Sequence, residues 1–254
     1  MSVYLIARNT FREATRDRLL AGVFVAGLVL LAATQVMSPL ALGEGRRLTV
    51  DLGLTAVSVL GLLIILLVGT SLVAKEIERR TIFNLLSRPI PRHVYLVGKW
   101  AGLTGALWSV AALLGCALWT LTRLRGDGGQ GVPIAQAVYL AGLELAVMTA
   151  LAVMFSAIST PVLSALYTLG CYLVGQWSYD LRAFAEKFSR PLSGLLETVA
   201  SIVPNLPLFN MRTLAASGET ASAAHLGVAT AYAAVYVSCV LALAAAAFES
   251  RDFK

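Results

Sequence analysis

A short charged segment of this 254-residue chain reads Lys75-Glu76-Ile77-Glu78-Arg79-Arg80-Thr81-Ile82-Phe83-Asn84-Leu85-Leu86-Ser87-Arg88-Pro89. It lies between two uncharged runs, Leu52–Ala74 and Trp100–Thr122, each long enough to cross a bilayer as a helix. Within the segment, Ile77, Thr81 and Leu85 repeat at a spacing of four residues, which predicts an amphipathic helix of about three turns. Such a helix lies flat on the membrane or contacts a soluble partner, and a solvated loop is the simpler alternative.

The composition indicates a helical membrane protein. Hydrophobic residues make up 58% of the chain, charged residues 13%, and the mean hydropathy is +0.78, whereas soluble domains carry about 25% charged residues. The apolar runs are long, where a transmembrane barrel would show short alternating segments. The formal net charge is +6, but the basic residues flank apolar runs without interleaved aromatic residues. We therefore interpret them as topology signals beside membrane lipid and expect no nucleic-acid partner.

Six runs of the sequence are apolar enough to be membrane spans. They are Leu19–Leu40, Leu52–Ala74, about Val97–Leu121, Ile134–Ile158, Val162–Trp177 and Ala223–Phe248. The fifth run is close to the lower length limit for crossing a bilayer, and only Ser159-Thr160-Pro161 separates it from the fourth, which predicts a tight hairpin. The expected fold is an all-α membrane protein with one domain over residues 1–254.

Amphipathic segments accompany these spans. Residues 1–18 are basic, and Val3, Ala7, Phe11 and Ala14 share one face, which is typical of a helix in the membrane interface. The region 178–220 predicts two short amphipathic helices that break at a proline and end before the sixth span. Lysine and arginine gather near the spans on the side that holds both termini and the charged segment, so this side is expected to be cytoplasmic.

Glu144 lies near the middle of the fourth predicted span. An ionised carboxylate at this depth costs about 2.5–3.5 kcal/mol on insertion scales, so its side chain should face the bundle interior or a water-filled cavity. Two interpretations stay open. Glu144 is a pathway or gating residue at an interface between two copies, or it is a structural acid bonded to a hydroxyl such as that of Ser109 or Thr149. No other predicted span offers a charged partner at mid-depth.

Catalytic and metal chemistry find little support in the sequence. The three cysteines fall inside apolar runs without ligand spacing, and the two histidines are far apart, so we expect no metal site. A G-x-x-x-x-G-K-S/T phosphate loop is also absent from the sequence. The chain is therefore expected to be no enzyme and to hold no cofactor, and any ATP hydrolysis must come from a separate subunit.

The order of these features resembles a known family. The features are the basic amphipathic start, two spans, the charged segment leading to Leu86-Ser87-Arg88-Pro89 and Gly98-Lys99, the fourth–fifth hairpin, the outer amphipathic helices and a terminal Arg251-Asp252-Phe253. Over essentially its whole length the chain resembles the permease subunits of bacterial ABC transporters with type V exporter architecture. Within that family it is similar to the permeases of nitrous-oxide reductase maturation and of gliding-motility systems.

The resemblance implies roles for particular segments. Residues 76–87 would form a cytoplasmic coupling helix that docks onto an ABC ATPase, residues 1–18 a connecting helix, and the outer helices of 178–220 a re-entrant cap over a pathway between two protomers. The implied contact residues are Glu76, Ile77, Glu78, Arg80, Thr81 and Leu85.

The resemblance also implies a location and partners. The chain would lie in the bacterial inner membrane with both termini cytoplasmic, paired with a second copy and with two ATPase subunits that bind ATP and Mg. Two functions stay open at this point. One is export of a substrate, which the sequence does not name, and the other is mechanical work on a periplasmic or outer accessory protein without transport.

Overall fold

The computed structural model describes residues 3–38, 44–71, 91–124, 126, 131–179 and 202–249. Within these ranges all the regular secondary structure is helical, without a strand. Five helical stretches there are long and apolar enough to cross a membrane, namely Arg18–Met37, Gly45–Ser71, His93–Leu124, Gly131–Ile158 and Ala223–Phe248. These findings confirm an all-α, multi-pass membrane protein.

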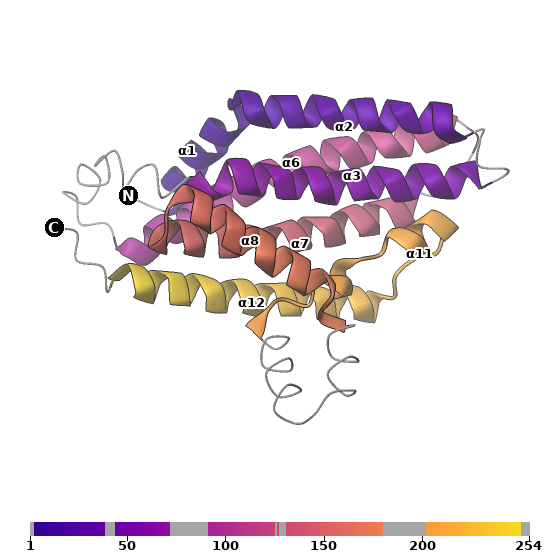
Figure 1. Cartoon of the computed structure of the whole chain (residues 1–254). Helices are drawn as coiled ribbons and strands as arrows, with labels where there is room; N and C mark the ends of the chain where they lie inside the picture. Colours follow the sequence, from indigo (N-terminus) through magenta and orange to yellow (C-terminus); the bar gives the residue numbers. More distant parts are fainter. Residues whose placement is uncertain are drawn as a thin grey trace.

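The long helices run side by side along one bundle, and the start of α1 and the end of α12 lie at the same end of it (Figure 1). We call this end the terminal end, and the opposite end, where α2 ends and α3 begins, the distal end. In chain order the elements are α1 (Val3–Thr15), α2 (Arg18–Met37), α3 (Gly45–Leu67), the 3-10 turn η2 (Gly69–Ser71), α6 (Arg92–Leu124), α7 (Gly131–Ile158), α8 (Pro161–Gln176), the 3-10 turn η3 (Leu206–Phe209), α11 (Arg212–Ser217) and α12 (Ala223–Glu249).

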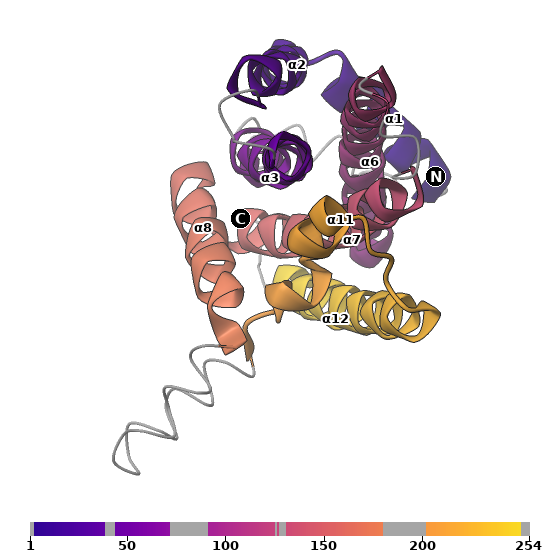
Figure 2. The same ribbon diagram turned by 90° about the vertical axis from the view of Figure 1, so that its right-hand side faces the viewer.

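Helix α7 forms the centre of the bundle. It contacts α3, α6, α8, α11 and α12, which surround it in the end-on view (Figure 2). Every residue from Leu140 to Val153 is buried, as expected of a helix that is apolar on all sides. Because lipid is as apolar as leucine, these helices are held together by close packing and hydrogen bonds rather than by hydrophobic transfer.

Helix α1 is amphipathic, as predicted, but its buried face is rotated from the expected one and shares only Ala14 with it. Its buried residues are Ile6, Thr10 and Ala14, whereas Phe11 of the predicted face is exposed. The reason lies in α6, where glycines let the backbone of α1 approach closely. A Cβ atom added at Gly102 would lie 2.5 Å from the carbonyl oxygen of Ala7 and 2.6 Å from Cβ of Thr10. The docking partner therefore sets the rotation of α1.

Helix α3 begins at Gly45, well before the predicted span at Leu52. The helical hydrogen-bond pattern already starts where Leu48 N donates to the carbonyl oxygen of Glu44 at 3.1 Å. Hydropathy placed the boundary at the last charged residue, but a helix continues as long as its backbone bonds are satisfied. As a result Arg47 and Asp51, expected in a linker or at the edge of a span, lie inside the helix.

The predicted fifth span corresponds to α8, which has 16 residues. At 1.5 Å per residue this helix is about 24 Å long, short of the roughly 30 Å of a hydrocarbon core. It turns back from the end of α7 and runs obliquely past the bundle (Figure 1). Six full spans are therefore not established by the described residues.

Two predicted segments lie largely or wholly outside the described residues. One is the proposed coupling helix of residues 76–87, and the other is most of the outer amphipathic region 178–220. The described end of that outer region contains η3 and α11. The sequence did not predict α11, because Pro204 and Pro207 were interpreted as the end of helical structure.

Candidate functional site

Glu144 lies near the middle of α7 with only 3% of its surface exposed. Its Oε1 atom accepts a hydrogen bond of 2.7 Å from Nε2 of Gln176, the last residue of α8. Its Oε2 atom accepts a longer bond of 3.4 Å from the hydroxyl of Ser58 on α3. Both carboxylate oxygens are thus held by donors from other helices.

Arg212 of α11 supplies positive charge to the same place. Its guanidinium interacts electrostatically with Glu144, and its Nη1 atom donates to the hydroxyl of Thr55 on α3 at 3.5 Å. The phenol of Tyr172 on α8 lies near the side chains of Gln176 and Arg212. We call this set the Glu144 cluster, and its members are Thr55, Ser58, Glu144, Tyr172, Gln176 and Arg212.

The Glu144 cluster joins α3, α7, α8 and α11. Removing two opposite charges from water costs more than their attraction returns unless further hydrogen bonds satisfy them. Ser58 and Gln176 supply those bonds to Glu144, and Thr55 supplies one to Arg212. A displacement of α8 or α11 relative to α3 and α7 would leave a charge or a polar group without its partner, at a cost of several kcal/mol in an apolar surrounding. The cluster therefore ties the relative positions of four helices to one another.

The structure answers part of what the sequence left open about Glu144. The side chain faces the bundle interior, as predicted. Its hydroxyl partner is Ser58, and the suggestion of Ser109 or Thr149 was wrong, because these hydroxyls donate to carbonyl oxygens of their own helices, each at 2.7 Å. Ser109 thus bonds within α6 and Thr149 within α7, and neither hydroxyl is bonded to Glu144.

Of the Glu144 cluster, the sequence analysis named only Glu144, and Arg212 is the charged member that it did not connect with this acid. It was assigned to the outer charges that report topology, because a window of local hydropathy cannot show which helix a distant loop residue will contact. One signal was present. Arg212 is the single lysine or arginine between Arg190 and Arg251, which is unusual enough in an apolar stretch to suggest a specific partner.

The predicted ATPase-contact residues lie outside the described residues, so their contacts remain predictions. They are Glu76, Ile77, Glu78, Arg80, Thr81 and Leu85. The structure describes the helices on either side of them. The 3-10 turn after α3 ends at Ser71 and α6 starts at Arg92, and both points lie at the terminal end of the bundle, near α1 (Figure 1).

Metal ligands do not gather in the described part of the chain, where no group of three or more His, Cys, Asp or Glu residues could hold an ion. Cys116, Cys171 and Cys239 are free thiols, and they stand on α6, α8 and α12, respectively. Within the Glu144 cluster, Glu144 and Ser58 are buried, whereas Thr55, Tyr172, Gln176 and Arg212 are half-buried.

Comparison with known proteins bears on the whole chain and not on the cluster alone. No curated protein matches the sequence significantly. A family model described as ABC-2 family transporter protein matches residues 4–253. The match includes every described helix except the first residue of α1. Because it covers nearly the whole sequence, the chain belongs to the ABC-2 family of transporter proteins.

Proposed function

We propose that this chain is the permease subunit of a type V ABC exporter, in which a separate cytoplasmic ATPase drives movement of a substrate across the bacterial inner membrane. The ABC-2 family consists of membrane components of ABC transporters, which supports the general assignment. In this proposal the chain has no catalytic role, and ATP and Mg bind to the partner. The resemblance to permeases of nitrous-oxide reductase maturation and gliding motility supports the narrower assignment.

The observation that carries the proposal is the arrangement at the terminal end. Helix α1 packs on the first half of α6, with a Cβ at Gly98 lying 2.7 Å from Ile6. The Nζ atom of Lys99, which is buried, lies 3.9 Å from a carboxylate oxygen of Glu13. Helix α6 begins at Arg92, directly after the part of the chain that holds the proposed coupling helix. In this proposal, a force on that part of the chain acts on the start of α6 and on α1, which packs against α6.

The sequence of the coupling segment suits a docking helix. Glu76 and Glu78 stand in its first turn, where carboxylates favour the positive end of the helix dipole. A Glu76–Arg80 pair at spacing four contributes only about 0.5 kcal/mol when exposed. The larger contribution is expected from Ile77, Thr81 and Leu85 filling a groove on the ATPase, as in other helix-in-groove contacts.

Single substitutions in this segment test the proposal. Ile77→Asp and Leu85→Asp each place a charge on the docking face, and Arg79→Asp places the same group on the opposite side of the helix as a control. We expect the first two variants to insert normally but to lose co-purification with the ATPase in mild detergent by about tenfold or more, which corresponds to 1.4 kcal/mol. Normal ATPase association and turnover in both variants would rule the proposal out.

The assembly we propose is a homodimer with two ATPase subunits, both termini cytoplasmic and lipid around the bundle. Six helices of one chain enclose too little space for a wide pathway, so the pathway is assigned to the region between two copies. The outer helices of 178–220 remain, in this proposal, re-entrant elements that cap it. Purification that yields isolated chains under mild detergent, without any ATPase, would contradict this assembly.

A second function has a specific observation in its favour. The outer segment is bonded to the bundle at several points: Tyr232 accepts from the backbone N–H of Asn205 at 2.9 Å, and Tyr236 donates to the carbonyl oxygen of Ile202 at 3.0 Å. Movement of α12 would thus pull on the outer segment and on any protein bound to it. Substrate flux in reconstituted vesicles distinguishes the two functions, because mechanical work on an outer partner requires none.

A further inference from the structure

One face of α3 carries polar residues at helical spacing. Arg47, Asp51, Thr55 and Ser58 follow one another at intervals of four, four and three residues from the distal end of the bundle. Residues at these intervals lie above one another on one side of a helix. Polar groups inside a membrane bundle contact other polar groups or water, since apolar surroundings leave them unsatisfied. We call these four residues the polar stripe of α3. The hydrogen bond to Glu144 accounts for Ser58 alone, so the other three need a separate explanation.

A cavity of about 570 Å³ opens at the distal end of this stripe. It lies between the end of α2 and the starts of α3 and α11, and Arg47, Asp51 and Thr213 are among its lining residues. A water molecule needs only about 10–15 Å³ of such space and two or more polar partners. Asp51 is half-buried there, and none of the ion pairs between described residues involves it.

Further polar side chains lie between this cavity and Glu144. Thr213 in the cavity wall is followed back along the chain by Arg212, whose guanidinium bonds to Thr55. Less than one turn of α3 further in, Ser58 bonds to Glu144. From Asp51 to Ser58 the helix rises by about 10 Å, and each turn presents a polar side chain.

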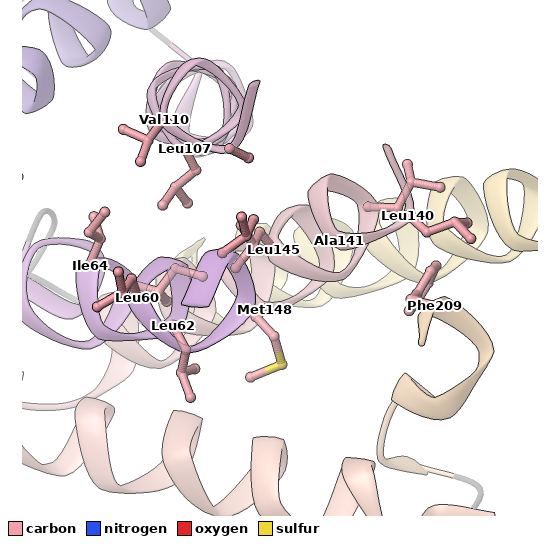
Figure 3. Packing of buried hydrophobic residues seen from close by; sticks show 14 of the residues in the cluster. Leu60, Leu62, Ile64, Leu107, Val110, Leu140, Ala141, Leu145, Met148 and Phe209 are labelled. Atoms are coloured by element: carbon pink, nitrogen blue, oxygen red, sulfur yellow. The ribbon is translucent and has the colours of Figure 1, made fainter. Parts of the chain in front are cut away.

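Directly beyond Ser58 the contact between α3 and α7 becomes apolar. Leu145 of α7 fills the space over Gly61, with its Cδ atoms 2.6 Å from where a Cβ at Gly61 would lie. Leu62 and Met148 are also buried in this contact. Figure 3 shows Leu145 and Met148 of α7 beside Leu60 and Leu62 of α3. The polar stripe therefore ends on a seal of large apolar side chains.

We propose that the stripe is a blind polar track, which admits water and small polar solutes from the distal side as far as Glu144 and is closed toward the terminal side by the Leu145 seal. Charges of both signs stand along it: Arg47 is paired with Glu44 at the distal mouth, and Arg212 lies near Glu144 at the inner end. The distal side is the outer side of the membrane only if the proposed function is correct.

Reaction of introduced cysteines with membrane-impermeant methanethiosulfonates tests the track in intact cells that express the complete complex. Cys116, Cys171 and Cys239 are first replaced by serine, and single cysteines are then introduced as Leu48→Cys, Thr55→Cys, Ser58→Cys, Leu62→Cys and Leu113→Cys. Leu48 lines the cavity, Leu62 lies in the seal, and Leu113 is exposed on the apolar surface of α6. The modified fraction is read from the mass of the purified chain.

We expect Thr55→Cys and Ser58→Cys to react at least about tenfold faster than Leu62→Cys and Leu113→Cys. Only a thiol in contact with water ionises to the reactive thiolate, and Ser58→Cys changes little but the polarity of one atom.

Three outcomes would overturn the track. Reaction of Leu48→Cys together with equally slow reaction of Thr55→Cys, Ser58→Cys and Leu62→Cys would mean that the stripe is dry. Equal reaction of Leu62→Cys would remove the seal. Reaction only in inside-out vesicles would reverse the direction. None of these results bears on ATPase association, so failure of the track is distinguishable from failure of the permease assignment.

Discussion

Gln176 Nε2 and Glu144 Oε1 are joined by a hydrogen bond of 2.7 Å, which ties the last residue of α8 to the middle of α7. Helix α8 carries several large apolar side chains on its outer surface, including Val162 and Leu166. Its end, by contrast, is held by a polar contact deep in the bundle. Any motion of α8 relative to α7 must therefore break or reshape the hydrogen bonds of Glu144.

Replacement of Glu144 is expected to abolish function without preventing assembly. Glu144→Gln keeps the size of the side chain but removes the charge that faces Arg212, and Glu144→Ala also removes both acceptors. Leaving buried donors unpaired costs about 1–3 kcal/mol, so thermal unfolding in detergent should begin at lower temperature in Glu144→Ala. Cellular function and ATPase co-purification are the two measurements.

A suitable control for Glu144 is Ser109→Ala. The Ser109 hydroxyl lies in another span and bonds only to the carbonyl oxygen of Ala106 in its own helix, so its loss should leave function and stability nearly unchanged. If Glu144→Ala instead supports full cellular function, Glu144 is neither a gate nor a substrate contact.

Arg212 and Glu144 are expected to be energetically coupled. Arg212→Met alone leaves Glu144 without its cation, and Glu144→Gln alone leaves Arg212 without its anion. The double variant removes both charges, so its loss of stability should be smaller than the sum of the single losses by about 0.5–3 kcal/mol, the usual range for residues that share one network of charges and hydrogen bonds. A double-mutant cycle on the unfolding midpoint measures this coupling, and strictly additive losses would show that the two side chains act independently.

Gly102→Ala is expected to loosen α1 from α6. The new methyl group would meet the carbonyl oxygen of Ala7 at 2.5 Å and Thr10 at 2.6 Å, and overpacking of this kind costs about 1–3 kcal/mol. Gly22→Ala on α2 is the matched control, because nothing lies within 4 Å of its added Cβ. Protease cleavage within residues 3–15 should become faster in the first variant only. Equal cleavage of both variants would contradict the close packing of α1.

Gln136 is expected to hold the end of the outer segment against α7. Its Oε1 atom accepts from the backbone N–H of Ala221 at 2.8 Å, and its Nε2 atom donates to the carbonyl oxygen of Ala221 at 3.5 Å. Gln136→Leu removes both bonds, whereas Gln136→Glu keeps the shorter one. Hydrogen exchange at Ala221 should therefore accelerate strongly in Gln136→Leu and less in Gln136→Glu, and unchanged exchange in both would show that other contacts fix the segment.

The sequence by itself determined where most helices lie. A chain in lipid must satisfy its backbone hydrogen bonds within each span, so long apolar runs can only be helices. The expected run Ile134–Ile158 falls within α7 and the run Ala223–Phe248 within α12. The inward direction of Glu144 followed from the same reasoning, because a carboxylate in hydrocarbon has no other favourable position.

Only the tertiary structure decided which groups meet. Ser58 and Glu144 are 86 positions apart, and Arg212 reaches them from a short helix that hydropathy did not predict. The rotation of α1 depended on the glycines of α6, and the inclusion of Asp51 in α3 depended on where the backbone bonds begin. Hydropathy reports the free-energy cost of placing each residue in lipid. Contacts between helices depend instead on how well two helix surfaces fit together. A local stretch of sequence does not specify which surface its partner will present.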